Sequence, residues 1–142
     1  MIPTTGRILE TCLYVADLDR AAEWYRQLFE FPIIFQQEDR LRALQVANDQ
    51  VLLLFKEKAS LKPTTMPGGV LPSHDGSGPT HIAFAIQTTE VGQWEMHLAK
   101  HGVAIKSRVH WGENDESLYF RDPDGHALEL ISADHWQKLA NG

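Results

Sequence analysis

The apolar and polar residues of this chain run through the same order of elements twice. The first pass is a strand, a helix and three further strands, over residues 8–16, 18–29, 33–38, 41–47 and 50–56. β-branched and aromatic runs mark the strands, and a three-and-four spacing marks the helix. The same order returns between residues 80 and 132. The sequence therefore predicts an α+β fold built from paired β-α-β-β-β modules.

Local signals fix the ends of several elements. Asp17 stands where a helix cap is expected, and Pro32 blocks continuation of the helix beyond residue 31. The apolar face of that helix comprises Leu18, Ala21, Ala22, Tyr25, Leu28 and Phe29. The polar pairs Asp39-Arg40 and Asn48-Asp49 favour tight antiparallel connections between the strands that follow.

The second pass ends in a hairpin and a short helix. Gly102 is expected to close the second helix, after which residues 103–110 read as a strand. The segments "SLYFR" and "HALELIS" flank Asp122-Pro123-Asp124-Gly125, whose proline and glycine suit a tight reversal. Residues 133–140 then predict a short terminal helix.

The modules predict one domain over residues 1–142, with a joining segment and a tail. We place the modules at about 7–56 and 79–132, the Pro- and Gly-rich linker at 57–78, and the tail at 133–142. The linker is either a flexible polar loop or a lid, and in the second case His74 and Asp75 would close over a site.

Composition narrows the classes of partner. The formal net charge of -6 at pH 7 opposes binding to nucleic acid or anionic membranes, and no cluster of Lys or Arg reverses it locally. No apolar run approaches the roughly 20 residues that cross a bilayer. Cys12 is the single cysteine, so an internal disulfide is excluded, and the N-terminus lacks the layout of a secretory signal. We expect a cytoplasmic protein that acts on a small molecule.

Glu129 is the residue that most demands an explanation. It lies within "ALELI", where an ionised carboxylate loses hydration at a cost of several kcal/mol unless cations or donors compensate. Strand alternation places Glu129 with Ala127 and Ile131, on the face opposite Leu128 and Leu130. Glu129 is therefore expected to face a cavity that holds a compensating group.

The repeat brings further candidates to the same place. Alternation in the strand that opens the second module puts Ile82 and Phe84 under the helix and leaves His81 on the cavity face. Alignment of the two modules superposes Glu10 on His81 and Leu53 on Glu129. If both sheets curve around a common cavity, these four positions meet, and three of them have metal-ligand chemistry.

Three separated motifs carry a family resemblance. "ETCLYVADLDRAAEWYRQLFEF", "GPTHIAFAI" and "SLYFRDPDGHALEL" resemble the vicinal oxygen chelate superfamily, the glyoxalase, bleomycin-resistance and dioxygenase-like fold, over roughly residues 7 to 132. The resemblance implies a curved mixed sheet around a cavity and a metal held by Glu10, His81 and Glu129. It also implies a homodimer, in which the long linker could permit exchange of halves between chains.

Two departures from the family pattern define the expected site. Glu10 stands where His or Gln is usual, and Leu53 stands where glyoxalase I has Glu. The resemblance thus implies three protein ligands and open coordination for a divalent ion, with Zn, Mn, Mg, Fe and Ni as candidates. No organic cofactor fingerprint is present. A metal with open positions can polarise a substrate oxygen or activate water.

The closing motif is most similar to the fosfomycin-resistance thiol transferases. In that family the positions of Ser117 and Tyr119 face the active cavity, so their hydroxyls are candidates, with Glu129, for catalytic contacts to an oxygen substrate or oxyanion. A lysine-bearing loop that precedes the serine in that family has no counterpart in "RVHWGENDES". Trp111, in this loop, is a candidate for lining the pocket.

Several residues have a plainer alternative. Glu10 could form a surface ion pair with Arg7, and Cys12 is more typical of a small core residue than of a nucleophile. His97 and His101 have metal-ligand spacing but are expected at the exposed end of a helix.

Two functions follow from this sequence. The first is a metal-dependent enzyme acting on a small oxygenated substrate, with lyase, isomerase, transferase and dioxygenase reactions all open. The second is a non-catalytic protein that sequesters a drug or metabolite in the same cavity, as bleomycin-resistance members of the family do.

Overall fold

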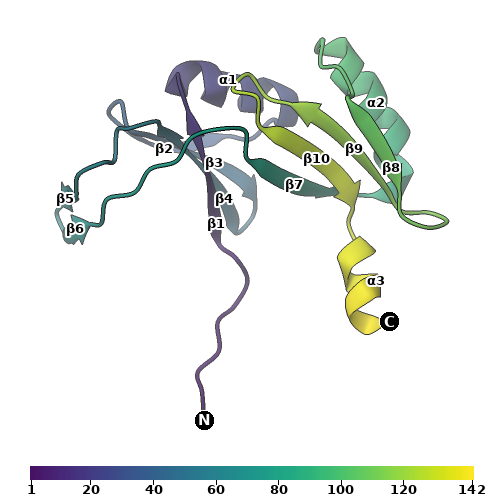
Figure 1. Cartoon of the computed structure of the whole chain (residues 1–142), viewed down its shortest axis with the longest axis horizontal. Coiled ribbons are helices and arrows are strands. Elements are labelled where there is room, and N and C mark those ends of the chain that lie inside the picture. The colour runs from purple at the N-terminus through teal and green to yellow at the C-terminus, as the bar shows by residue number, and fades with distance from the viewer. The chain divides into compact units, whose positions relative to one another are not determined.

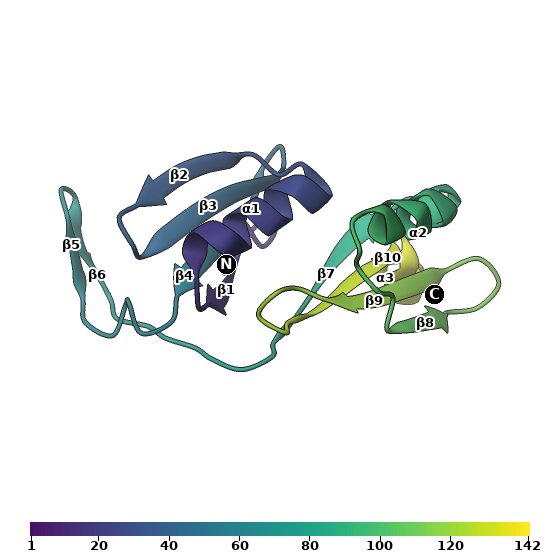
Figure 2. The ribbon, with the colours of Figure 1, turned by 90° about the horizontal axis from the view of Figure 1, so that it is seen from above.

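The computed structural model describes residues 1–142 and divides into two compact units, Met1–Ser77 and Gly78–Gly142. Each unit holds a four-stranded mixed sheet with a helix on one face (Figures 1 and 2). The α+β class and the repeated order of elements are therefore confirmed. No helix combines the length and the apolar character required to cross a membrane.

The first unit contains one helix, one four-stranded sheet and a small hairpin. Its elements are β1 (Glu10–Val15), α1 (Leu18–Phe29), β2 (Ile33–Gln37), β3 (Leu41–Ala47), β4 (Gln50–Lys56), β5 (Thr64–Met66) and β6 (Gly69–Leu71). The strand order is β1-β4-β3-β2, with β1 parallel to β4 and the remaining neighbours antiparallel. Figure 1 shows β5 and β6 projecting as a ribbon away from this sheet.

The second unit repeats this arrangement. Its elements are β7 (His81–Ile86), the 3₁₀ turn η1 (Thr88–Glu90), α2 (Val91–Lys100), β8 (Ser107–His110), β9 (Glu116–Arg121), β10 (Ala127–Ser132) and α3 (His135–Asn141). The strand order is β7-β10-β9-β8, and β7 runs parallel to β10. The fourth strand of each four-stranded sheet thus lies between the first and the third, which is the same topology in both.

The registers of the two sheets also correspond. Cys12 on β1 pairs with Leu53 on β4, and Ala83 on β7 pairs with Glu129 on β10. Cys12 lies two residues after Glu10, and Ala83 lies two residues after His81. The alignment of Glu10 with His81 and of Leu53 with Glu129 therefore preserves the strand pairing within each sheet.

Helix α1 forms where its signals place it. Asp17 accepts a hydrogen bond from the Arg20 amide at 3.1 Å, and the helix ends at Glu30, which is left-handed with φ 58°. Its apolar face packs onto β3 and β4, and Leu13 and Val15 on the neighbouring β1 are 2% and 0% exposed. Strand alternation in β1 is therefore as expected, with the two apolar residues on the helix side.

The second unit has its own apolar core. Leu128, Leu130, Phe120 and Leu118 from the sheet, with Leu98 from α2, are all at most 1% exposed. Leu128 and Leu130 on β10 pair with Phe120 and Leu118 on β9, so these four buried side chains share one face, as alternation predicts. The opposite face is thereby left to the polar residues of β9 and β10.

Two local predictions need correction. Residues 103–110 were expected to form one strand, but β8 starts only at Ser107. The Val103 amide donates to the Leu98 carbonyl at 2.9 Å and so finishes the end of α2 instead of joining the sheet. The linker is also less irregular than expected, because Met66 pairs with Gly69 around a two-residue turn at Pro67 and Gly68.

Candidate functional site

Glu129 occupies the centre of β10 and is 6% exposed, so its predicted burial is confirmed. Its Oε2 accepts hydrogen bonds from Ser117 Oγ at 2.5 Å and from Tyr119 Oη at 3.0 Å. Tyr119 is the register partner of Glu129 on β9, and Ser117 lies two residues earlier on the same face. The donors that the buried carboxylate requires therefore come from the adjacent strand.

His81 approaches the other carboxylate oxygen. Its Nε2 lies 3.2 Å from Glu129 Oε1, while its Nδ1 lies 2.8 Å from the carbonyl oxygen of Ala127. A carbonyl only accepts, so Nδ1 carries a hydrogen, and Nε2 is the ring nitrogen that faces Oε1. A ring nitrogen and a carboxylate oxygen at this distance are bridged either by a proton or by a metal cation.

This arrangement fits a divalent metal. A histidine that ligates a metal through one nitrogen usually donates from the other to a carbonyl or carboxylate, which fixes the ring and its tautomer. Here the Ala127 carbonyl fills that role for His81, and the two hydroxyls do so for Glu129. A nitrogen and an oxygen ligand suit Zn²⁺, Mn²⁺, Fe²⁺ or Ni²⁺.

The third predicted ligand belongs to the other unit. Glu10 is exposed at the start of β1, and Arg7, its suggested partner, instead pairs with Asp49 at 2.8 Å. Neither unit by itself gathers three or more His, Cys, Asp or Glu side chains at one place. The structure brings together His81, Ser117, Tyr119 and Glu129, and the part of Glu10 stays a prediction.

Tyr119 is held in its protonated form. Burial raises the pKa of its hydroxyl, and the hydrogen bond to the negatively charged Glu129 raises it further. Its ring also stacks on His81, with centroids 6.3 Å apart. Tyr119 is therefore a hydrogen-bond donor to Glu129 throughout the neutral pH range.

The loop before β9 contributes a contact that the sequence did not indicate. Trp111 was expected at most to line the pocket, yet its Nε1 donates to Ser117 Oγ at 2.7 Å. Sequence offers no signal for this bond, because Trp111 lies six residues upstream in an irregular loop. The contact of His81 with the Ala127 carbonyl was also missed, because it depends on the pairing of β7 with β10.

The corresponding face of the first sheet carries different groups. Tyr14 Oη and His74 Nδ1 lie 2.7 Å apart, and burial, followed by the neighbouring Cys12 and Asp75, raises the pKa of Tyr14 to about 12. Asp75 accepts from the Lys58 amide at 2.8 Å. The two linker residues thus bind within their own unit, while Cys12 is exposed and is not the core residue that was expected.

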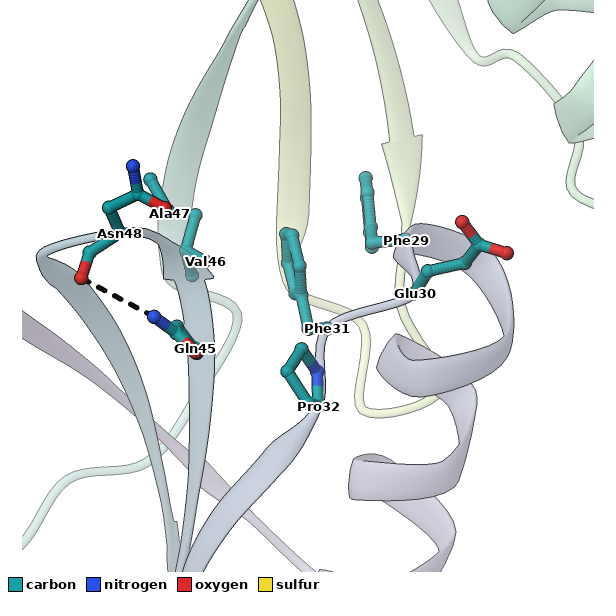
Figure 3. Close-up of a pocket in the computed structure, with 8 residues that line it drawn as sticks. All are labelled: Phe29, Glu30, Phe31, Pro32, Gln45, Val46, Ala47 and Asn48. Atoms are coloured by element: carbon teal, nitrogen blue, oxygen red, sulfur yellow. Dashed lines mark hydrogen bonds between the residues drawn. The ribbon is translucent and has the colours of Figure 1, made fainter.

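A shallow hollow of about 360 Å³ lies elsewhere in the first unit (Figure 3). The stacked rings of Phe29 and Phe31, with centroids 4.9 Å apart, form one side of it. Its only carboxylate belongs to Glu30, which Figure 3 shows directed away from the strand of Gln45. The hollow contains none of the predicted site residues and offers no metal-ligand set.

Comparison with known sequences gives a consistent result. Residues 7–130 match the Glyoxalase/Bleomycin resistance protein/Dioxygenase superfamily. The chain is 32% identical to the metallothiol transferase FosB of Bacillus licheniformis over 127 residues, which cover 88% of this chain and 74% of the relative. It is also 32% identical to the fosfomycin resistance protein FosX of Listeria monocytogenes over 123 residues, 83% of each chain.

Solved structures agree on the fold. A lactoylglutathione lyase from Agrobacterium tumefaciens is 28% identical, with a TM-score of 0.83 over 94% of this chain and 98% of the other. A FosX mutant from Listeria monocytogenes, solved with Mn(II) and 1S,2S-dihydroxypropylphosphonic acid, shares the fold at 20% identity and a TM-score of 0.69, over 96% of this chain and 99% of the other. The chain therefore belongs to the Glyoxalase/Bleomycin resistance protein/Dioxygenase superfamily.

Proposed function

We propose that this protein is a metal-dependent enzyme that acts on a small oxygenated substrate. The observation that carries the proposal is the opposition of His81 Nε2 and Glu129 Oε1 at 3.2 Å, with His81 Nδ1 donating to the Ala127 carbonyl on the other side of the ring. His81 and Glu129 are two of the proposed ligands, and Glu10 is the third.

The chain's own residues prepare this pair for a cation. Ser117 and Tyr119 both donate to Oε2 of Glu129, so the hydroxyl protons are committed to the carboxylate rather than to a substrate. We assign these two residues the role of orienting Glu129, with Oε1 turned toward His81. A divalent ion bound there supplies Lewis acidity toward a substrate oxygen and keeps coordination positions open.

Among the possible reactions, thiol addition to a small strained oxygen compound is favoured. The support is the 32% identity to a metallothiol transferase across 88% of this chain. In such a reaction with an epoxide, sulfur forms a bond to a ring carbon, the C–O bond breaks, and the thiol proton ends on the new hydroxyl. Fosfomycin, which appears in the name of the FosX relative, is the first epoxide to test.

Metal binding is the first test. Protein treated with chelator is titrated calorimetrically with Mn²⁺, Zn²⁺, Mg²⁺, Fe²⁺ or Ni²⁺, and we expect one ion per chain. Glu129→Ala should abolish this binding, whereas Glu95→Ala should leave it unchanged, because Glu95 pairs with Arg108 on the surface. Absence of binding in the wild type, or equal binding by Glu129→Ala, would contradict the proposal.

The reaction is tested separately. Metal-loaded protein is incubated with fosfomycin or other small epoxides and a set of low-molecular-weight thiols, and mass spectrometry follows the adduct. We expect an adduct that disappears on addition of chelator and in Glu129→Ala. A compound that binds tightly, stays chemically unchanged and ignores chelator would instead support the sequestering function.

A further inference from the structure

Ser117 has one hydroxyl proton and two polar neighbours. Trp111 Nε1 lies 2.7 Å from Ser117 Oγ, and Glu129 Oε2 lies 2.5 Å from it on another side. An indole nitrogen only donates, so Ser117 accepts from Trp111. Of these two neighbours only Glu129 accepts, so the single proton of Ser117 is directed to Glu129 Oε2, while the indole N–H occupies a lone pair of Oγ.

The direction of that proton matters for Glu129. With Ser117 and Tyr119 both donating, Oε2 is saturated, and Oε1 is the carboxylate oxygen that faces His81 Nε2. If the Ser117 proton turned elsewhere, Oε2 would keep one donor and compete with Oε1 for a cation. The indole bond restrains the orientation of the Ser117 hydroxyl and thereby favours Oε1 as the oxygen that the carboxylate presents to a cation.

The position of Trp111 is fixed by contacts with Asp115 and with helix α3. Its amide donates to the Asp115 carbonyl at 2.8 Å, and its ring packs against His135 of α3 with centroids 5.2 Å apart. The Asp115 carboxylate contacts His135 Nδ1 at 3.2 Å and Lys138 Nζ at 2.8 Å. The loop and α3 therefore hold the indole in one orientation, although Trp111 is 40% exposed.

We propose that Trp111 is a positioning residue that acts through Ser117 to fix Glu129 for metal binding. This inference rests on the proposed function, because it assigns a task within the same metal site. A tryptophan that merely lined the pocket would need only its ring, and phenylalanine would serve equally well. A positioning tryptophan needs its N–H.

A double-mutant cycle on Mn²⁺ affinity separates these roles. Trp111→Phe keeps an aromatic ring and removes the donor, and we expect about tenfold weaker binding, the lower end of the range for outer-shell residues. Ser117→Ala should cost about 10- to 100-fold. If Trp111 acts through Ser117, the double variant should bind no more weakly than Ser117→Ala alone.

The matched control is Trp94→Phe, on α2 of the same unit, for which wild-type affinity is expected. Thermal unfolding of each variant verifies that it is folded. Wild-type Mn²⁺ affinity in Trp111→Phe would overturn the inference. So would a double variant in which Trp111→Phe weakens Mn²⁺ binding as much in the Ser117→Ala background as it does in the wild type.

A measurement without metal keeps this inference separate from the function. In ¹⁵N-labelled metal-free protein, the indole N–H signal of Trp111 should exchange slowly with solvent, and Ser117→Ala should shift it and speed its exchange. If this holds while the wild type binds no Mn²⁺, the proposed function fails but the hydrogen-bond chain stands. Fast exchange in the wild type, unaffected by Ser117→Ala, would refute the chain itself.

Discussion

Equivalent positions of the two sheets carry opposite chemistry. On the non-helical face of the second sheet, Ser117, Tyr119 and Glu129 form a polar group, and the same register positions in the first sheet are Leu41, Ala43 and Leu53. The strand order and pairing are the same in both. The backbone plan therefore allows the candidate site without requiring it, and the side chains on one face decide which half holds it.

The hairpins that precede the last strands differ in the same way. Between β9 and β10, Asp122 is buried, contacts His126 Nδ1 at 2.8 Å and accepts from the Asp124 and His126 amides at 3.0 and 2.9 Å. Between β3 and β4, Asn48 and Asp49 are exposed. The turn between β9 and β10 is thus stabilised by contacts of a buried side chain, and the turn between β3 and β4 is not.

The largest expected effect concerns these turns. Asp122→Ala removes one member of a buried pair and leaves His126 without its partner, which should lower the free energy of unfolding by about 3 kcal/mol. Asp49→Ala breaks only an exposed ion pair with Arg7 and should cost at most about 1 kcal/mol. Urea denaturation of both variants measures the difference. Equal losses in the free energy of unfolding would show that the two aspartates stabilise their turns to the same extent.

Glu129→Leu makes the second sheet resemble the first at its central position. We expect Mn²⁺ affinity to fall at least about 100-fold, or about 2.7 kcal/mol. The variant should still fold, because the first sheet accommodates Leu53 at the same register. Calorimetry and thermal unfolding check both parts. Retained affinity would show that the polar group is not what distinguishes the two halves.

Glu10→Gln tests whether the metal site of the second unit needs a ligand from the first unit. If Glu10 is the third ligand, its neutralisation should weaken Mn²⁺ binding about tenfold, or about 1.4 kcal/mol. Glu30→Gln, a change of an exposed carboxylate in the same unit, is the matched control. Equal affinities for the two variants would restrict the metal ligands to the second unit.

The smallest expected effect concerns the pH dependence of stability that arises from the contacts of α3. The Lys138 ammonium, followed by His135, holds the pKa of Asp115 below its ordinary 3.8. Because the folded pKa is the lower one, this contact stabilises the fold above about pH 4, and the contribution disappears as pH falls through the folded pKa. Asp115→Asn should remove this contribution at pH 7 and flatten the dependence of the free energy of unfolding on pH.

The measurement is urea denaturation at pH 7 and at pH 3, followed by tryptophan fluorescence. The first unit offers a comparison, since Lys56 lowers the pKa of Asp39 in an exposed pair. Asp39→Asn should change stability less than Asp115→Asn. The opposite order would show that surface pairing outweighs the docking of α3.

The sequence predicted much of the fold because its signals are local. Helix α1 and strands β3 and β4 have the expected bounds, since a cap, a proline and two polar turns mark their ends. The start of β8 was misplaced because Val103 is apolar enough for a strand, yet its amide is used by the end of α2. A competing backbone partner leaves no trace in composition.

The candidate site was predictable in part. The apolar neighbours of Glu129 indicated a buried carboxylate, and strand alternation with the family resemblance indicated Ser117 and Tyr119. The roles of Trp111 and of the Ala127 carbonyl depend on how a loop and two strand ends meet. Such contacts arise from tertiary structure, so spacing along the chain does not predict them.

The insertion of β10 between β7 and β9 has a consequence for synthesis on the ribosome. A nascent chain that has emerged only as far as residue 126 already holds His81, Ser117 and Tyr119, but it lacks the strand that lies between their strands and carries Glu129. The candidate site is therefore assembled only when β10, the last strand of this sheet to be synthesised, inserts between β7 and β9.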